Sequence, residues 1–449
     1  MEKVKSYWKR PEVQDDIMSF AEDYKLFLDR SKTERMAVSE IERIAKDAGY
    51  KNLEDVEELK KGDRVYVNNK GKSMMLFDIG EDPEEGMAII ASHIDSPRLD
   101  VKPNPLYEEE NVGLLKTHYY GGIKKYQWTS IPLAIHGVMF KKDGTKVDIH
   151  IGSDPEDPIF TITDLLPHLS KSQNKKSLAE GIIGEKLNIL VGHMPGEEDV
   201  KEALLALLKE KYDVEEDDFS VSELEVVPAF SARDLGFDRS MIAGYGQDDR
   251  VCSYASLRAF IDGKDRERTC VAIFADKEEI GSVGNTSMSA NYFKNALGEV
   301  LHAMGNDQHL AINRALANSY VLSADVTAAF DPNYPEVMDK LNAARLGEGV
   351  CLMKYTGARG KSGTSDANAE FLAELRKKFE EDDIIWQVGE MGKVDEGGGG
   401  TVAYILAETG AEVVDLGTAL FSMHAPYEVA SKADIYSTYK AYASFLTMK

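Results

Sequence analysis

The amino-acid sequence predicts an α/β protein in which helices flank a mixed central sheet and a β-rich domain is inserted into the chain. Apolar strand-like runs alternate with helical patterns in the first hundred residues and again after about residue 245, as in sheets covered by helices. Between these regions, short β-like runs are separated by glycines and Asp-Pro pairs, a texture typical of hairpins. We therefore expect an α/β domain formed by residues 1–105 and 236–449, with the β-rich domain at 106–235 inserted between its two parts.

Helices precede the first buried strand. Residues 11–48 carry two amphipathic helical patterns separated near "SKTE". "GMAIIASHIDSP" (86–97) is an apolar run that leads into a loop with Pro97, so a short buried strand is expected there.

The middle of the chain differs from both flanks. "TSIPLAIHGVMF" and "TKVDIHIG" predict strands of a hairpin-rich sheet, and "DVKEALLALLKEKY" (199–212) predicts a helix. "DDFSVSELEVVPAF" is expected to form a loop and a further strand.

In the last segment the patterns of helix and strand alternate again. The expected helices are "DDRVCSYASLRAFI", "DANAEFLAELRKKF" and "TVAYILAETG", and the expected strands are "TCVAIFA", "SYVLSAD", "DIIWQVG" and "AEVVDLGTAL". This order favours one sheet built from both ends of the chain.

Charge and composition exclude several classes of protein. Lys and Arg number 53 against 78 Asp and Glu, giving a net charge of −25, whereas a nucleic-acid-binding protein needs a basic face. No apolar run is long enough to span a membrane, and the first residues show no apolar signal-peptide core, so we expect a cytoplasmic protein without membrane partners. Three cysteines (Cys252, Cys270 and Cys351) lack Cys-x-x-Cys spacing, which argues against a disulfide framework or a thiolate zinc site.

Acidic residues and histidines recur where the predicted strands of the outer segments end. In open α/β sheets, ligands gather at such ends. The residues concerned are His93, Asp95, Asp248, Asp249, Glu278, Glu279, Asp325 and His424. Each has an ordinary explanation by itself, as a structural histidine, a helix cap or a solvated charge. Together, imidazoles with carboxylates suit Zn²⁺, Co²⁺ or Mn²⁺ better than Ca²⁺ or Mg²⁺.

Five segments in order carry a resemblance to a known family. They are "SHIDSPRLDVKP", "QDDRVCSYASL", "DKEEIGSVGNTS", "SADVTAAFDPNYPE" and "SMHAPYEVASKADI". The chain closely resembles the aspartyl aminopeptidase / aminopeptidase I family of di-zinc metallopeptidases. The resemblance implies an aminopeptidase that releases N-terminal residues from peptides with a free N-terminus, using two divalent metal ions and a metal-activated water.

The resemblance assigns the metal ligands residue by residue. His93 and Asp325 would hold one ion, and Glu279 and His424 the other. Asp248 would bridge both ions, and the bond that joins it to Asp249 would be the cis peptide often seen there in the family.

The resemblance also assigns three residues outside the ligand set. Glu278 would be the general base, passing a proton from the water to the leaving amine, and Asp95 would orient the ring of His93. His168, in "DLLPHLS" of the inserted domain, would reach the active site of a neighbouring subunit. The implied assembly is a homo-oligomer, a dodecamer built from dimers.

Substrate preference remains open between acidic and neutral or apolar N-terminal residues. "CLMKYTGARGKSGTS" (351–365) offers Lys354, Arg359 and Lys361 for an acidic side chain, or forms a solvated surface loop. Members that prefer aspartate tend to carry histidines after the Asp325 position, where this chain has Ala328 and Asp331.

Three further interpretations remain as alternatives. The glycines of "DEGGGGT" (395–401) form a tight turn near the substrate or bind an anion through backbone N–H groups. The chain as a whole fits, as rivals to an aminopeptidase, a di-metal deacylase or carboxypeptidase of similar core, or a non-catalytic shell or scaffold protein.

Overall fold

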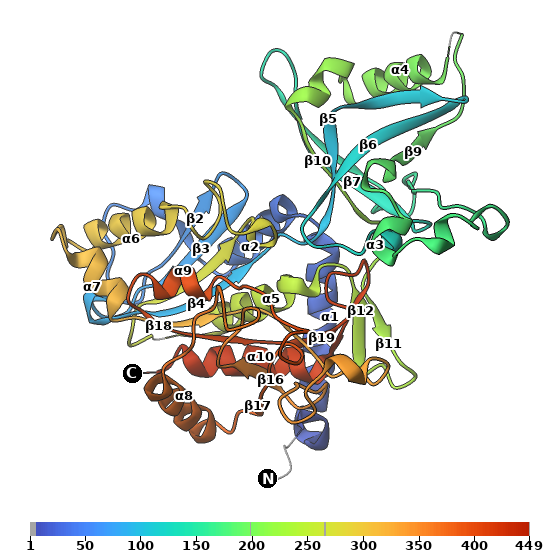
Figure 1. Cartoon of the computed structure of the whole chain (residues 1–449). Coiled ribbons are helices and arrows are strands. Elements are labelled where there is room, and N and C mark those ends of the chain that lie inside the picture. The colour runs from blue at the N-terminus through green and yellow to red at the C-terminus, as the bar shows by residue number, and fades with distance from the viewer. Residues whose placement is uncertain (1–5, 198, 265, 449) are drawn as a thin grey trace. The chain divides into compact units, whose positions relative to one another are not determined.

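A computed structural model describes residues 6–197, 199–264 and 266–448. By its internal contacts the chain divides into two units (Figure 1). The first contains the described residues of Met1–Asp95, Ala232–Met423 and Tyr427–Lys449, and the second contains those of Ser96–Ser231 and His424–Pro426. The chain therefore leaves the first unit after Asp95 and re-enters it at Ala232.

A nine-stranded mixed sheet forms the centre of the first unit. The strand order is β1-β2-β3-β13-β4-β14-β18-β16-β17. These strands are β1 (Lys51–Asn52), β2 (Arg64–Asn69), β3 (Ser73–Asp78), β4 (Ala88–His93), β13 (Cys270–Ala275), β14 (Tyr320–Ser323), β16 (Val350–Met353), β17 (Trp386–Val388) and β18 (Glu412–Gly417). Its middle strands β13, β4, β14 and β18 are mutually parallel. The predicted α/β class with a mixed sheet is confirmed.

Helices cover both faces of this sheet, because its central strands are apolar on both sides. In β13, Ala272 and Phe274 belong to one buried cluster and Val271 and Ile273 to the other. The first cluster includes side chains of α1 (Gln14–Arg30), α2 (Glu34–Asp47), α5 (Gln247–Asp262), α8 (Ala369–Glu381) and α10 (Lys432–Phe445). The second includes side chains of α6 (Tyr292–Ala303), α7 (Ala311–Ala317) and α9 (Ala403–Ala407).

A smaller five-stranded sheet also belongs to the first unit. Its order is β11-β12-β20-β19-β15, with β11 (Arg233–Leu235), β12 (Met241–Gly244), β15 (Thr327–Ala328), β19 (Ala419–Phe421) and β20 (Glu428–Ser431). The antiparallel register of β12 on β20 sets Gly244 opposite Glu428. This pairing brings the segment just before α5 next to the C-terminal part of the chain.

The second unit is built on a six-stranded antiparallel sheet, as its hairpin-rich sequence predicts. The order is β8-β7-β10-β5-β6-β9, with β5 (Arg98–Glu109), β6 (Val112–Tyr120), β7 (Leu133–Phe140), β8 (Lys146–Ile151), β9 (Ile189–Gly192) and β10 (Glu223–Pro228). Its helices are α3 (Leu178–Gly181) and α4 (Val200–Tyr212). Among the described residues, no helix of either unit is both long and apolar enough to cross a membrane.

Candidate metal centre

Three neighbouring parallel strands deliver the predicted ligands to one edge of the large sheet. Strand β4 ends at His93, which is paired with Ala275 at the end of β13. The chain then reaches Glu278 and Glu279 in a short 3₁₀ turn, Glu278–Ile280. On the other side of β4, strand β14 ends at Ser323, two residues before Asp325. Because parallel strands share their carboxyl edge, these side chains converge as the sequence predicts.

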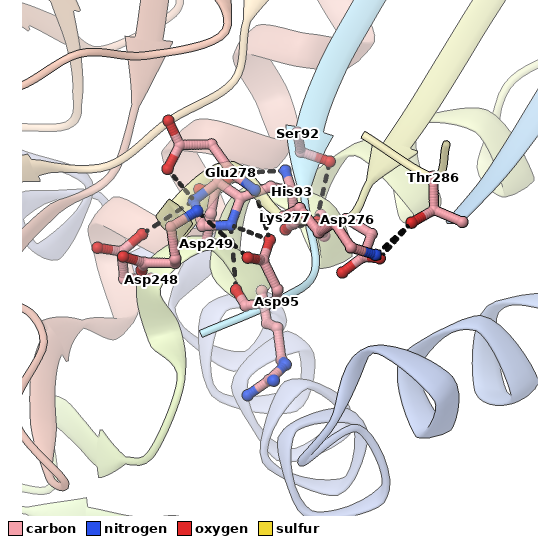
Figure 2. Close-up of polar contacts among 12 residues, drawn as sticks. Ser92, His93, Asp95, Asp248, Asp249, Asp276, Lys277, Glu278 and Thr286 are labelled. Carbon is pink, nitrogen blue, oxygen red and sulfur yellow. Dashed lines mark hydrogen bonds and ion pairs between the residues drawn. The ribbon is translucent and has the colours of Figure 1, made fainter. Parts of the chain in front are cut away.

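The ring of His93 lies at the middle of this cluster, only 2% exposed. Its Nε2 is 3.3 Å from Asp248 Oδ1 and 4.0 Å from Glu278 Oε2 (Figure 2). Its Nδ1 is 3.0 Å from the backbone oxygen of Asp95 and 3.3 Å from Asp95 Oδ1. In the neutral ring, a proton on Nδ1 held by Asp95 leaves the Nε2 lone pair toward the carboxylates, which is the form of the ring that binds metals.

Asp95 also fixes the turn that carries the two glutamates. Its Oδ1 accepts a hydrogen bond from the backbone N–H of Glu278 at 3.1 Å, and its Oδ2 accepts one from Glu279 at 3.2 Å. Asp95 is completely buried. One carboxylate therefore sets the position of the imidazole and of both glutamates.

Next to the glutamate turn, a partly buried polar contact holds the end of β13. Lys277 Nζ donates to Asp276 Oδ2 and to Thr286 Oγ1, each at 2.7 Å (Figure 2). Lys277 adopts a left-handed backbone conformation with φ of 65°, and this reversal turns the chain from the strand into the glutamate pair.

Asp248 and Asp249 lie in the first turn of helix α5 with non-helical backbone angles, and the peptide bond that joins them is cis, as the resemblance implies. The N–H of Asp248 donates to Glu428 Oε2 at 3.1 Å, and the N–H of His93 donates to Asp249 Oδ2 at 3.2 Å. Asp248 is thus held through its backbone N–H, whereas Asp249 uses its carboxylate to hold the backbone of His93. Gln247 Nε2 donates to the backbone oxygen of Glu428 at 2.7 Å and reinforces the same turn.

Ligand atoms gather in two groups around His93. His93, Asp248 and Glu279 offer one donor atom each within 4.8 Å of one another, and so do His93, Asp249 and Asp325. The sequence pattern offered both Asp248 and Asp249 as candidates, and the family resemblance assigned only Asp248 as a ligand. Glu428 and Gln247 had no local sequence signal, because their role depends on the register between β12 and β20.

The electrostatics of the cluster favour a bound cation. Burial raises the pKa of Asp249 well above its ordinary value, and burial together with repulsion from Asp249 raises the pKa of Asp325. Burial lowers the pKa of His93, but its contacts with Asp248 and Asp95 more than offset this, so that the pKa lies well above its usual range. Carboxyl groups crowded and buried in this way are stabilised as anions by a metal ion, whose binding releases the protons. The imidazole and carboxylate donors fit divalent ions of the zinc type.

Two predicted site residues lie in the second unit. His424, with a left-handed φ of 64°, places its Nδ1 2.8 Å from the backbone oxygen of Gly122. A ring that donates from Nδ1 again presents its Nε2 lone pair. His168 lies in the exposed 3₁₀ turn Pro167–Leu169.

The fold and the site together define a metallohydrolase-type α/β protein whose ligands come from strand ends of a mixed sheet. More particularly, the chain belongs to the aminopeptidase I zinc metalloprotease family (M18), whose family model matches residues 27–446. It is thus an aminopeptidase of a zinc metalloprotease family, and the resemblance inferred from five sequence segments is confirmed.

Similar proteins cover the whole chain. A probable M18 family aminopeptidase 1 of Clostridium acetobutylicum is 52% identical over 96% of this chain and 95% of its own. Another of Thermotoga maritima is 50% identical over 96% of both chains. A crystal structure of an M18 family aminopeptidase from Thermotoga maritima matches with a TM-score of 0.97 and 48% identity over 100% of both chains. A structure of the S. cerevisiae mApe1 dodecamer shares the fold, with a TM-score of 0.77 and 21% identity over 95% of both chains.

Proposed function

We propose that this aminopeptidase works with two divalent metal ions and that Glu278 is its general base. The observation that carries the proposal is the grouping of ligand atoms in two sets around His93, one with Asp248 and Glu279 and one with Asp249 and Asp325. Two sets of donors around one buried ring are more than a single ion needs.

The proposed ligands follow the family's pattern. His93 and Asp325 would hold one ion, Glu279 and His424 would hold the other, and Asp248 would be shared by both. A carboxylate between two dications would reduce the repulsion between them. Asp249, which contacts the N–H of His93 at 3.2 Å, supports the first of these two sites from behind its ligands. We propose zinc as the ion, with cobalt or manganese as substitutes.

The two adjacent glutamates have different tasks. The ligand atom of Glu279 lies in one cluster with those of His93 and Asp248. Glu278 is outside that cluster: its Oε2 lies 4.0 Å from His93 Nε2, and 17% of its side chain is exposed. Bound metal supplies a Lewis acid for the scissile carbonyl and lowers the pKa of a water molecule. Glu278 then accepts a proton from the attacking water and delivers it to the leaving amine. A positioned base contributes about 10²–10⁴-fold in rate.

The test uses initial rates on aminoacyl and peptide substrates with free and blocked N-termini, with chelator and after readdition of zinc. Glu278→Gln is expected to lower kcat by about 10²–10⁴-fold while zinc content stays at the wild-type level. Glu370→Gln, an exposed glutamate at the start of α8, is the matched control with wild-type rates. Wild-type activity of Glu278→Gln contradicts the role of the base. Faster cleavage of blocked peptides favours a deacylase or carboxypeptidase, and chelator-independent rates contradict the metal mechanism.

For substrate preference, we propose neutral or apolar N-terminal residues. Asp366 pairs with two of the three cations available for an acidic side chain, with Lys361 at 2.7 Å and Lys354 at 3.2 Å. Lys361 also lies over the ring of Tyr355, with 3.8 Å from Nζ to the ring centroid. Because these two lysines already pair with Asp366, they are expected to bind the carboxylate of an acidic substrate side chain only weakly.

For assembly, we propose a homo-oligomer that extends to a dodecamer, the form named for the S. cerevisiae protein. Residues 106–235 are proposed as the inserted oligomerisation domain and residues 1–105 and 236–449 as the two parts of the catalytic domain. The exposed position of His168 on its 3₁₀ turn supports its proposed reach into a neighbouring subunit's active site.

A further inference from the structure

Two histidines face each other across neighbouring strands of the second unit. His136 on β7 is paired with His150 on β8 in the antiparallel register, and their Nδ1 atoms are 3.3 Å apart. His136 is 1% exposed, whereas His150 is exposed to solvent. Neither residue belongs to the ligand sets proposed above.

The pair ends a row of ionisable side chains that crosses the sheet. The cross-strand partners are His150 with His136, His136 with Glu225, Glu225 with Asp100, and Asp100 with His118. Residues directly opposite one another in a sheet share a face. Their sequence neighbours Ile135, Ile149 and Leu224 point to the other face, where they line an apolar cavity of about 890 Å³. One face of the sheet is therefore apolar, and the other carries the row.

The side chains of this row carry a net negative charge, which favours an added cation. Arg98 contacts both central carboxylates, with Nη2 3.3 Å from Glu225 Oε1 and Nε 2.8 Å from Asp100 Oδ1. One guanidinium against two carboxylates leaves a net charge of −1 when the imidazoles are neutral. A dication at the histidine end of the row is thus not repelled by its surroundings.

Ser153 orients the buried ring of the pair. Its Oγ is 2.7 Å from His136 Nε2, so that a ring protonated at Nε2 donates to the serine and turns the lone pair of Nδ1 toward His150. A hydrogen-bonded partner on the far nitrogen is how proteins fix the tautomer of metal-binding histidines.

The separation of the two Nδ1 atoms fits a shared metal ion. Two nitrogens that each bind tetrahedral zinc at about 2.0–2.1 Å lie about 3.3–3.4 Å from one another, in agreement with 3.3 Å here. At this separation the two rings form a direct hydrogen bond when no ion lies between them. We propose that His136 and His150 bind one additional zinc ion through their Nδ1 atoms, with water completing the coordination, at a site separate from the catalytic ligands.

Zinc binding to the holoenzyme tests this site. Zinc-loaded protein is equilibrated by dialysis against increasing free Zn²⁺, and bound zinc per chain is counted for wild type and for His150→Ala. His150 is exposed, so its replacement preserves the fold, and melting without added zinc verifies this. His118→Ala, an exposed histidine of the same row whose Nδ1 is 2.7 Å from the backbone oxygen of Tyr119, is the matched control.

We expect wild type and His118→Ala to bind one zinc ion per chain more than His150→Ala at saturation. Ser153→Ala should weaken this extra binding by about 10–100-fold, as loss of an orienting partner does. Added zinc should raise the Tm of wild type and not that of His150→Ala, because the ion stabilises the fold that binds it. Equal zinc counts for wild type and His150→Ala contradict the proposal and leave a plain hydrogen bond between the rings. Since aminopeptidase activity is not the readout, this outcome does not depend on the proposed catalytic mechanism.

Discussion

Replacing Asp95 by Asn tests whether one carboxylate positions the whole metal centre. Asp95 uses both oxygens to accept backbone N–H groups of Glu278 and Glu279, and it also contacts Nδ1 of His93. Asparagine has a single acceptor oxygen, so one of the two backbone N–H groups would face an amide donor instead. The variant therefore loses one hydrogen bond to a charged group, worth about 1.5–3 kcal/mol.

This loss converts to about a 10–150-fold change in an equilibrium constant, at 1.4 kcal/mol per factor of ten. We expect the zinc affinity of Asp95→Asn to fall by this factor, which overlaps the range of about 10–100-fold known for partners that orient metal ligands. Competition with a chromogenic chelator measures the affinity, and activity at limiting and at saturating zinc shows whether kcat recovers when metal is in excess.

Asp434→Asn is the matched control. Asp434 is also completely buried, and its carboxylate accepts two backbone N–H groups, from Gly347 at 2.6 Å and Gly349 at 2.8 Å. Asp434→Asn should lower the free energy of unfolding about as much as Asp95→Asn does, and its zinc affinity should stay at the wild-type value. Unchanged affinity in Asp95→Asn, or an equal loss in both variants, would refute the role given to Asp95.

Further predictions concern the second glutamate, pH and substrate choice. Glu279→Ala should lower both zinc content and activity, measured by elemental analysis alongside Glu278→Gln, which keeps its zinc; full zinc content in Glu279→Ala contradicts its assignment as a ligand. Burial raises the pKa of Asp415 to about 6 from an ordinary 3.8, so its contribution to stability is present below about pH 4 and lost as pH rises through 6, by about 3 kcal/mol. The free energy of unfolding of Asp415→Asn, measured with denaturant between pH 4 and 8, should not show that loss. If wild type and Asp415→Asn differ by the same free energy at every pH, the role given to Asp415 is wrong. Leu and Met substrates should be cleaved with higher kcat/KM than Asp and Glu substrates, and the reverse order would show that the cations near Asp366 are available to substrate.

Much of the site could be predicted because its ligands sit at the ends of apolar strands. His93 and the glutamate pair follow buried runs that can only be central strands, and parallel neighbours bring such ends together. Asp325 follows the same rule. In the structure β13, β4 and β14 are parallel neighbours, so the strand ends that the pattern of apolar runs indicates lie side by side.

Other features depend on contacts that no local pattern encodes. The sequence cannot tell which of Asp248 and Asp249 turns toward Asp325, because the answer depends on the backbone geometry at the start of α5. Glu428 supports Asp248 across 180 residues through strand pairing. The helix expected over 401–410 is shorter, Ala403–Ala407, because its last residues form a turn instead, which ends at Gly410 with a φ of 93° that favours glycine. The role of His168 came from the family resemblance alone, whereas His424 was also a candidate from its place after a predicted strand.

A crystal structure of the zinc-loaded protein, with anomalous data collected at the zinc absorption edge, tests the two-metal centre most directly. We predict two strong peaks about 3.5–4 Å apart at the carboxyl ends of β4, β13 and β14, bound by His93, Asp248, Glu279, Asp325 and His424. A single peak there, or two peaks without His93 as a ligand, would contradict the proposed two-metal site.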